Sequence, residues 1–536
     1  MSRPHRRMLT LPSAEALTVG PNALRLRKKK DRLLFMTYNL LAQALVRRDM
    51  FPHSSQKALK WKFRKQNILQ EFLSYGPDLA CLQEVDFWEE VYLPSLIKAG
   101  YDTAYYKNAN KKHGCAIIWR KTRFEKENQL TLEYDDIGQP TFTTGNVGLM
   151  VALKPLTQKI HENPDPNADM ILPEENETQQ NEDDHAGQAE KVPGGLLVAT
   201  THLFWRPDGS YERLRQASIF VEKIQEWNKN LNYTVLIGGD FNTTPRDAAY
   251  RAMTRSQMPP HQIPNLEKWL IDEVARVQEA QAPAASDESK DSIDELTAKT
   301  GNLDLSTNKG KETPSSDLPY RAPPTGIILP KKSASSTPSP PAEKNGGDSP
   351  SPPSTIVNAA EFATSEDPKI KNLAAQDFKA TAEDAPVYAP LEAFTPPKDL
   401  LASIESRPRC ISIYSQYETL IKNSPGEKCD PAILAAAAAA EAAAVAKGTA
   451  EESTASPAPT QHMHGEPAFT NFANWFKDTL DYVYLLDEPL KADGARLVPL
   501  KLLEIPDASF LGHGLPDENF SSDHLCLLVE FAILAQ

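Results

Sequence analysis

Short apolar runs alternate with amphipathic segments along the first 255 residues. Runs rich in β-branched and aromatic residues predict buried strands, and segments with apolar residues every three to four positions predict helices. The expected strands span residues 33–41, 78–85, 114–119, 146–153, 195–203 and 235–240, and the expected helices span 54–75, 86–98 and 211–229. Alternating strands and helices indicate an α/β layered fold, to which the helix-poor stretch around 115–203 adds antiparallel pairs.

The run from Val235 to Pro245 ends the last of these strands with polar side chains. Asp240 and Asn242 are two positions apart, so both side chains lie on one face of an extended segment. Thr244 to Asp247 follows as a helix start, with a capping hydroxyl and a proline at the first helical position. On this motif alone, an Asx-rich turn that closes a core strand is favoured over a catalytic site.

The pattern of strands and helices breaks down in the middle of the chain. Residues 283–400 hold 17 of the 44 prolines and no Trp or Cys, so they cannot bury enough apolar surface to offset the entropy of ordering. Apolar runs return later, with strands expected at 480–485 and 520–531. The expected parts are a basic disordered arm (1–30), a folded domain built from 31–255, 407–423 and 467–536, an acidic disordered loop within it (161–191), a mostly disordered Pro/Ser/Ala-rich insertion (256–406), and a low-complexity Ala-rich insertion (424–466) with a frayed helix at 432–447.

Charge and cysteine content narrow the class of protein. The formal net charge of −14 argues against diffuse nucleic-acid binding, so a polyanionic substrate would need a local basic or metal-neutralised cleft. The basic arm could serve nuclear import, RNA phosphate contact or a mitochondrial presequence, or could simply solubilise the chain. Five scattered cysteines and the absence of a long apolar run predict a soluble, intracellular protein without membrane contact, either cytoplasmic or nuclear, with mitochondria left open.

Polar residues stand at or inside the apolar strand segments at seven places. Each has an ordinary explanation alone: a turn-forming amide, a salt-bridged carboxylate or a structural histidine. Together they would cost several kcal/mol if they were buried without partners, so they are expected to meet. The seven are Asn39, Glu84, His202, Asp240, Asn242, Asp481 and His524.

These residues lie in motifs whose order resembles the endonuclease/exonuclease/phosphatase superfamily. The motifs are Met-Thr-Tyr-Asn39, Cys-Leu-Gln-Glu84, Thr-His202-Leu-Phe-Trp, Gly-Asp240-Phe-Asn242-Thr-Thr-Pro, Leu-Asp481-Tyr and Ser-Asp523-His524. Phe469-Thr-Asn-Phe, Leu515-Pro-x-Glu-Asn-Phe520 and Arg-Leu-Arg-Gln216 are similar to the branch of carbon-catabolite-repression deadenylases, nocturnin and Ngl-type RNA exonucleases, and Ile411-Ser-Ile-Tyr-Ser415 favours the Ngl type. Two positions depart from the pattern: His113 replaces an Asp that many relatives have, and Arg206 stands where the deadenylases are often acidic.

The resemblance implies a DNase I-like four-layer α/β sandwich, in which two packed mixed sheets are flanked by helices and carry long disordered insertions. It also implies phosphodiester cleavage that depends on Mg²⁺, with Mn²⁺ as a possible substitute. Glu84 is a hard oxygen ligand suited to Mg²⁺, with Asn39 helping to set its geometry and Asp523 supporting the metal shell. If a second metal binds, its ligands would be Asp240, Asn242 and His524.

The implied catalytic roles use the remaining motif residues. Asp240 would orient or deprotonate the attacking water, and Asn242 would fix that water or a phosphate oxygen. His202 would donate to the phosphoryl oxygen, and Asp481 would orient His524.

The resemblance also implies a substrate-binding set. Phe476 matches the base-stacking aromatic of the family, for which a plain core aromatic is the alternative interpretation, and Pro207 would line the same pocket. The remaining expected substrate contacts are Asn146, Lys112 and Arg213.

The hypothesis is therefore a 3′-to-5′ RNA exonuclease that acts on RNA 3′ ends and releases 5′-nucleotides, in 3′-end processing or poly(A) shortening. One alternative keeps the fold and acts as a phosphatase or 2′-phosphodiesterase on small substrates, although the Trp-Cys-Asp-Arg type run of inositol phosphatases is missing after Asp481. Another is a non-enzymatic scaffold. No leucine-rich repeat precedes the fold, so the enzyme is expected to act alone or to be recruited differently from the large deadenylase complex.

Overall fold

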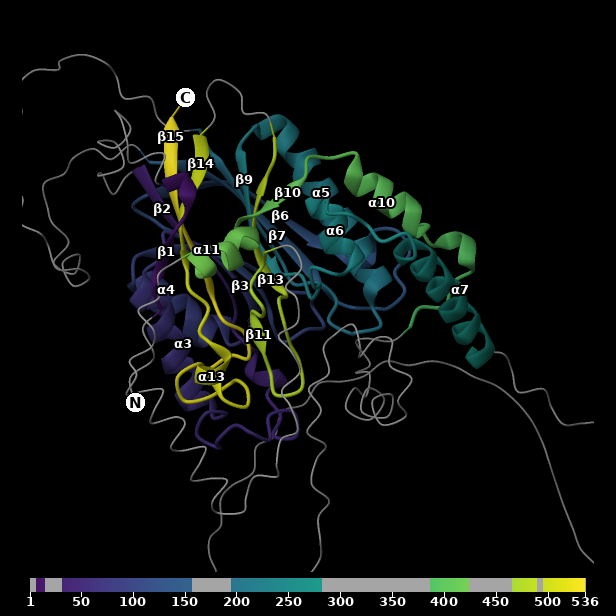
Figure 1. Ribbon diagram of the computed structural model, residues 1–536, viewed down its shortest axis with the longest axis horizontal. Helices are drawn as coiled ribbons and strands as arrows, with labels where there is room; N and C mark the ends of the chain where they lie inside the picture. The colour runs from purple at the N-terminus through teal and green to yellow at the C-terminus, as the bar shows by residue number, and fades with distance from the viewer. Residues whose placement is uncertain are drawn as a thin grey trace, which may run out of the picture. The chain divides into compact units, whose positions relative to one another are not determined.

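Two mixed β-sheets form the centre of the protein (Figure 1). The computed structural model describes residues 6–14, 31–156, 194–281, 386–423, 465–488 and 495–535. The first sheet has the order β1 (Met8–Thr10), β14 (Ala495–Leu503), β15 (Leu527–Ala535), β2 (Arg32–Asn39), β3 (Leu79–Val85), β5 (Gly114–Arg120) and β4 (Tyr101–Tyr106). The second has the order β10 (Cys410–Ser412), β13 (Asp481–Leu486), β9 (Thr234–Asp240), β8 (Leu196–Thr201), β7 (Val147–Pro155) and β6 (Phe124–Glu133).

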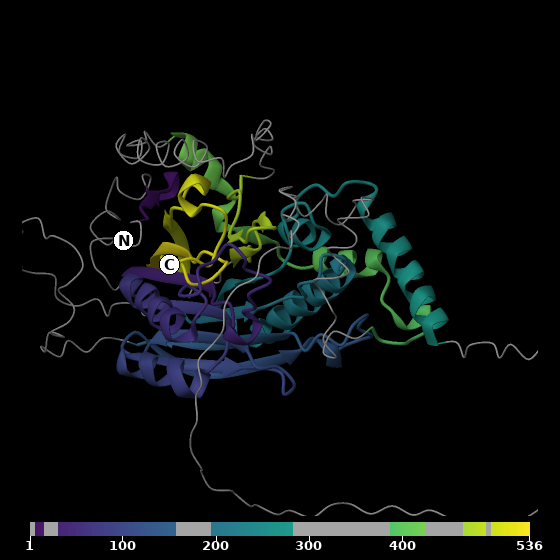
Figure 2. The same ribbon diagram turned by 90° about the horizontal axis from the view of Figure 1, so that it is seen from below.

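Three apolar clusters divide the fold into four layers. Alternate strand residues, such as Phe35 and Cys81 from the first sheet and Val198 and Leu236 from the second, form the cluster between the sheets. The other face of the first sheet packs on α3 (Trp61–Tyr75) and α4 (Leu93–Lys98). The other face of the second sheet packs on α5 (Ser210–Leu231), α6 (Ala248–Thr254), α7 (Gln262–Gln281) and α10 (Pro397–Glu405). Figures 1 and 2 show α3 and α7 on opposite sides, and the predicted four-layer sandwich is confirmed.

Strand direction brings one set of strand ends to a common edge. β2 and β3 are parallel neighbours, and so are β8 and β9, so their carboxyl ends lie on the same side. β13 runs antiparallel to β9 and places Asp481 opposite Asp240, while β15 runs antiparallel to β2 and places Leu527 opposite Thr37. The polar residues at the ends of β2, β3, β8 and β9 therefore lie close to the residues that begin β13 and to those that precede β15.

Two predicted helix starts are wrong. The first helix begins at Trp61 rather than at residue 54, because residues 51–60 form turns. The helix expected from Thr244 begins at Ala248, with Asp247 at the N-cap. The Asp247 carboxylate accepts a hydrogen bond from Thr244 N at 2.8 Å and so stabilises the turn that precedes the helix. The Thr244 hydroxyl does not cap the helix.

The structure also has order where the sequence predicted none. In the predicted disordered arm, β1 pairs with β14 and the buried Arg6 donates to the carbonyls of Glu504 and Cys526. α7 lies in the segment expected to be mostly disordered, where Leu266, Leu270 and Val274 are spaced by four and face the core. The acidic loop 161–191 and the Ala-rich helix 432–447 fall outside the described residues. No helix in the described ranges has the length and apolar composition needed to cross a bilayer.

Glu466 makes stability depend on pH. It is buried, and its Oε1 accepts a hydrogen bond from Tyr250 Oη at 2.7 Å. Burial raises the pKa of Glu466 to about 7, so between pH 4.5 and 7 the folded state binds a proton that the unfolded state does not. Stability from this group is therefore present at pH 5 and lost as pH rises through 7. In urea unfolding, Glu466→Gln is expected to remove about 2 kcal/mol of the difference between pH 5 and pH 8.

The exposed Glu392 provides the matched control. Glu392→Gln is expected to follow the parent at both pH values. If Glu466→Gln and the parent show the same pH dependence, the carboxyl group of Glu466 is ionised in the folded protein throughout this range.

Candidate active site

One amide joins the ends of three strands from both sheets. Asn39, the last residue of β2, donates from Nδ2 to Glu84 Oε1 at 3.1 Å and to Asp240 Oδ2 at 2.8 Å. Its Oδ1 accepts from Leu41 N at 2.9 Å, which fixes the orientation of the amide. Two carboxylates that are distant in sequence are thus held beside a single neutral donor.

Two of the site residues adopt a strained backbone. Glu84 has φ 53° and lies at an irregularity in the pairing of β3 with β5, and Asn242 has φ 47°. The left-handed region costs a non-glycine residue about 1 to 3 kcal/mol and is typical of functional positions. Ala42 N donates to Glu84 Oε2 at 3.0 Å, and Asn242 N donates to Asp240 Oδ1 at 2.9 Å, so both bends place a carboxylate where a backbone amide holds it.

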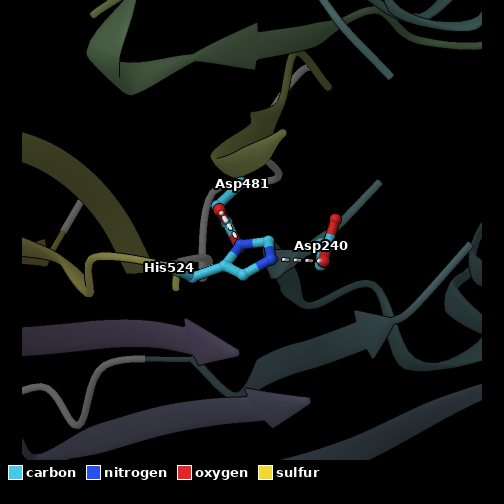
Figure 3. Close-up of side chains that lie close together, drawn as sticks. All are labelled: Asp240, Asp481 and His524. Carbon is cyan, nitrogen blue, oxygen red and sulfur yellow. Dashed lines mark hydrogen bonds and ion pairs between the residues drawn. The ribbon is translucent and has the colours of Figure 1, made fainter. Parts of the chain in front are cut away.

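A histidine lies between two carboxylates at the same edge. Figure 3 shows the His524 ring with Nδ1 toward Asp481 Oδ2, at 2.8 Å, and Nε2 toward Asp240 Oδ2, at 3.6 Å. Thr470 Oγ1 donates to Asp481 Oδ2 at 2.6 Å and accepts from the backbone amides of Leu480 and Asp481. Thr470 was missed by sequence reasoning, although it lies in the Phe469-Thr-Asn-Phe motif.

Burial and neighbouring charges shift the pKa values of this group. Burial alone would lower the pKa of His524, but the carboxylates of Asp481 and Asp240 outweigh it and raise that pKa well above its ordinary value. Burial raises the pKa of Asp240 to about 7, although the neighbouring His524 opposes the shift. The site therefore holds an imidazolium next to a carboxyl group that can exchange a proton near neutral pH.

A second histidine, His202, is neutral and lies near the carboxylates of Glu84 and Asp240. His202 Nε2 lies 3.8 Å from Glu84 Oε1 and 3.7 Å from Asp240 Oδ2. Burial, with Lys111 and His524 nearby, lowers the pKa of His202 to about 3. The ring centroid of His113 lies 6.3 Å from that of His202, and burial lowers the pKa of His113 to about 4. Both imidazoles are neutral at physiological pH and can donate one N–H each.

The acidic residues fit a hard divalent cation. Asp523 Oδ1 is buried and has no hydrogen-bond partner among the described residues. Burial raises the pKa of Asp523, and the Glu84 carboxylate raises it further, against the effect of His524. An unpartnered carboxylate oxygen near a second carboxylate is the environment that Mg²⁺ stabilises, with Asn39 adjoining it.

A second set of candidate metal ligands includes a histidine. The ligand atoms of Asp240, Asp481 and His524 lie within 4.8 Å of one another, a separation that could also hold a metal. Both ring nitrogens of His524 already face carboxylates, so this histidine would have to give up one of those contacts to bind the second metal predicted for it.

Three of the predicted substrate contacts, which carry no charge, are partly or fully buried. Asn146 donates from Nδ2 to the carbonyl of His202 at 2.9 Å, and its buried Oδ1 has no hydrogen-bond partner in the described part of the chain. Phe476 is half-buried in the turn between β11 (Asn471–Phe472) and β12 (Lys477–Asp478), and Asn471 forms a backbone bridge to His524. Pro207 is half-buried in the loop that follows His202.

The two predicted basic contacts differ in burial. Arg213 is buried, and its Nη atoms donate to the carbonyls of Phe204, Arg206 and Pro207. The guanidinium therefore holds the loop that contains Pro207, and its contact with substrate stays a prediction. Lys112 is exposed, whereas the charge of the neighbouring Lys111 acts on His202. Spacing alone could not choose between two adjacent lysines.

Comparison with known proteins finds one matching family and several related RNA exonucleases. Residues 36–274 match the Endonuclease/Exonuclease/phosphatase family. The RNA exonuclease NGL2 of Saccharomyces cerevisiae is 37% identical over 245 residues, which cover 42% of this chain and 42% of that protein. A probable RNA exonuclease of Schizosaccharomyces pombe is 36% identical over 254 residues, which cover 46% of this chain and 42% of that protein. The chain thus spans less than half the length of these curated relatives.

A solved structure, the crystal structure of ANGEL2, a 2′,3′-cyclic phosphatase, is similar over 98% of both chains, with 18% identity and a TM-score of 0.48.

Proposed function

Because the chain carries a domain of the endonuclease/exonuclease/phosphatase family and matches Ngl-type RNA exonucleases, we propose that it is a metal-dependent 3′-to-5′ exoribonuclease. It would release 5′-nucleotides from RNA 3′ ends in the cytoplasm or nucleus, in 3′-end processing or poly(A) shortening. The observation that carries the proposal is the bridge from Asn39 to Glu84 and Asp240 beside the charged His524. This group supplies a cation site, a base and cationic charge at one sheet edge.

Glu84 and Asp523 would hold the cation, with Asn39 completing the set. A bound Mg²⁺ neutralises charge that develops on the phosphate during hydrolysis. Asn39 keeps Glu84 and Asp240 at a fixed separation, because its one amide donates to both.

Asp240 would accept the proton of the attacking water. Its pKa of about 7 suits proton transfer at neutral pH, and the imidazolium of His524 stabilises the ionised form. Asn242 holds Asp240 in place through its backbone N–H. The neutral His202 would donate from Nε2 to a phosphate oxygen.

Phe476 would stack on the terminal base, with Pro207 lining the same pocket, and stacking of this kind is worth about 1 to 3 kcal/mol per base. Asn146 would place its unpartnered Oδ1 toward the nucleotide, and Lys112 would contact a phosphate from the loop surface.

The test uses the full chain and an RNA labelled in its last nucleotide. With Mg²⁺ the first labelled product is expected to be a 5′-mononucleotide, and EDTA is expected to stop its release. Glu84→Gln is expected to raise the Mg²⁺ concentration for half-maximal rate at least about tenfold, because one anionic ligand is lost. Glu125→Gln, on the exposed face of β6, is expected to behave as the parent.

Three outcomes would overturn the proposal. One is cleavage that is independent of metal, and another is cleavage inside the RNA with no mononucleotide released. The third is release of inorganic phosphate from small or cyclic phosphates while RNA length stays unchanged, which would assign the chain to the phosphatases.

A further inference from the structure

An exposed aromatic ring, Phe87, lies close in sequence to the candidate metal ligand Glu84. Phe87 follows Glu84 by three residues, so its Cα lies within about 10 Å of the Cα of Glu84. The Phe87 ring stacks on Trp61, the first residue of α3, with centroids 4.7 Å apart and an interplanar angle of 25°. Even so, 42% of Phe87 is exposed.

The backbone of Phe87 adds a second observation. Its φ is 48° and its ψ is 37°, a left-handed conformation that is a marked outlier for a bulky aromatic residue. Neither burial of the ring nor a side-chain cap of the following helical turn accounts for this strain. Strain of about 1 to 3 kcal/mol that holds an apolar ring at the surface is typical of a ligand-contacting position.

The surroundings of the pair are basic. Residues 55–65 contain five Lys or Arg and no acid, in a chain whose formal net charge is −14. Lys57, Lys60 and Lys62 are exposed, and no carboxylate in the described part of the chain lies within ion-pair distance of them. The exposed carboxylates near this segment are Glu89 and Glu90, which follow Phe87, and Glu518, which accepts a hydrogen bond from Ser55 Oγ.

We infer that Phe87 and Trp61, with Lys57, Lys60 and Lys62, form a second RNA-contact site, termed here the upstream platform. A base of single-stranded RNA stacks on the exposed Phe87 ring while the lysines contact flanking phosphates, a combination that is typical of sequence-tolerant single-strand binding. The inference rests on the proposed function: the 3′ end occupies the catalytic pocket, and nucleotides on its 5′ side cross the platform. The enzyme therefore prefers an unpaired 3′ tail to a very short or base-paired end.

The decisive variant removes the ring and keeps the backbone. Asparagine adopts the left-handed conformation more readily than phenylalanine, so Phe87→Asn deletes the stacking face without added strain. Binding of a fluorescent 15-nucleotide RNA is measured by anisotropy with Mg²⁺ in an Asp240→Asn background, in which turnover is expected to be about 10³- to 10⁴-fold slower. Phe87→Asn is expected to weaken binding at least fivefold, and Phe87→Tyr is expected to restore it within twofold. Ile97→Ser, a change at another exposed apolar residue, on α4, is expected to have no effect.

Turnover separates a substrate contact from a structural defect. In the active protein, which keeps Asp240, Phe87→Asn is expected to raise KM for the 15-nucleotide RNA. Its kcat/KM for a dinucleotide is expected to stay within twofold of the parent value. Equal losses on both substrates, or unchanged binding of the longer RNA, would overturn the platform. If the parent cleaves no RNA at all but Phe87→Asn still weakens binding, the proposed function fails while the RNA contact stands.

The lysines are tested by salt dependence. The triple variant Lys57→Gln, Lys60→Gln, Lys62→Gln is expected to reduce the slope of log K against log salt by about 2, since each single-strand phosphate contact contributes about 0.7. The control triple Lys121→Gln, Lys268→Gln, Lys398→Gln changes the same net charge at exposed positions on other elements and is expected to leave the slope unchanged. Equal slopes for the two triples would show that the three lysines do not contact RNA phosphates and would overturn their part in the platform.

Discussion

Asp240→Asn is expected to lower the rate of RNA cleavage by about 10³- to 10⁴-fold without unfolding the protein. The amide keeps the shape of the side chain and can still accept a hydrogen bond from Asn39, but it cannot take a proton from water. General base catalysis alone contributes about 10²- to 10⁴-fold. The imidazolium of His524 also loses a carboxylate partner at 3.6 Å. Single-turnover rates at saturating RNA and Mg²⁺ measure the effect, and thermal unfolding checks the fold.

Asp247 provides a control in the same loop. Its carboxylate accepts hydrogen bonds from Thr244 N and Thr243 Oγ1 and closes the turn after β9. Among the described residues, no predicted site residue donates a hydrogen bond to this carboxylate. Asp247→Asn is expected to destabilise the turn and to reduce cleavage less than tenfold. If Asp240→Asn cleaves RNA within tenfold of the parent, Asp240 is not the base, and the site must activate water through another group.

The strand ends could be predicted because they follow from short-range patterns. An apolar run that ends in Asn39, Glu84 or Asp240 is visible in the sequence, and strands joined by helices bring such ends to one edge. The resemblance to a family supplied the pairing of Asp481 with His524. The Thr470 hydrogen bond to Asp481 depends on where a separate segment crosses the strand, which no local pattern encodes.

The features that sequence reasoning missed have equally specific causes. The strain at Glu84 comes from an irregularity in strand pairing, and β3 reads as an ordinary apolar strand in the sequence. The backbone role of Arg213 was not foreseen, because its fork geometry suits three backbone carbonyls as well as a phosphate, and sequence position does not choose between them. α7 was missed because the prolines that follow it outweighed the four-residue spacing within it.

Asp481→Asn is expected to lower the cleavage rate by about 10³-fold. The Asp481 carboxylate accepts from His524 Nδ1 at 2.8 Å and, with Asp240, raises the pKa of that imidazole. An amide in its place can present an N–H to the ring and favour the wrong tautomer, an effect that is large when a carboxylate orients a catalytic histidine. Rates are measured as for Asp240, and NMR of labelled histidine follows the titration of His524. In the parent, His524 is expected to stay charged through neutral pH, and in Asp481→Asn it is expected to lose that charge at a lower pH.

Thr470→Val tests whether Asp481 acts by orientation or only by charge. The substitution keeps the volume and leaves the carboxylate beside His524. It removes the hydroxyl that donates to Asp481 Oδ2 at 2.6 Å and accepts from the backbone amides of Leu480 and Asp481. If orientation matters, the rate is expected to fall about tenfold, roughly the value of one hydrogen bond to a charged group, with His524 still charged at neutral pH. A rate equal to the parent would leave Asp481 a purely electrostatic role.

A His524 titration that is the same in Asp481→Asn as in the parent would contradict the pairing itself, because the pKa of a buried imidazole must respond when its nearest carboxylate is neutralised.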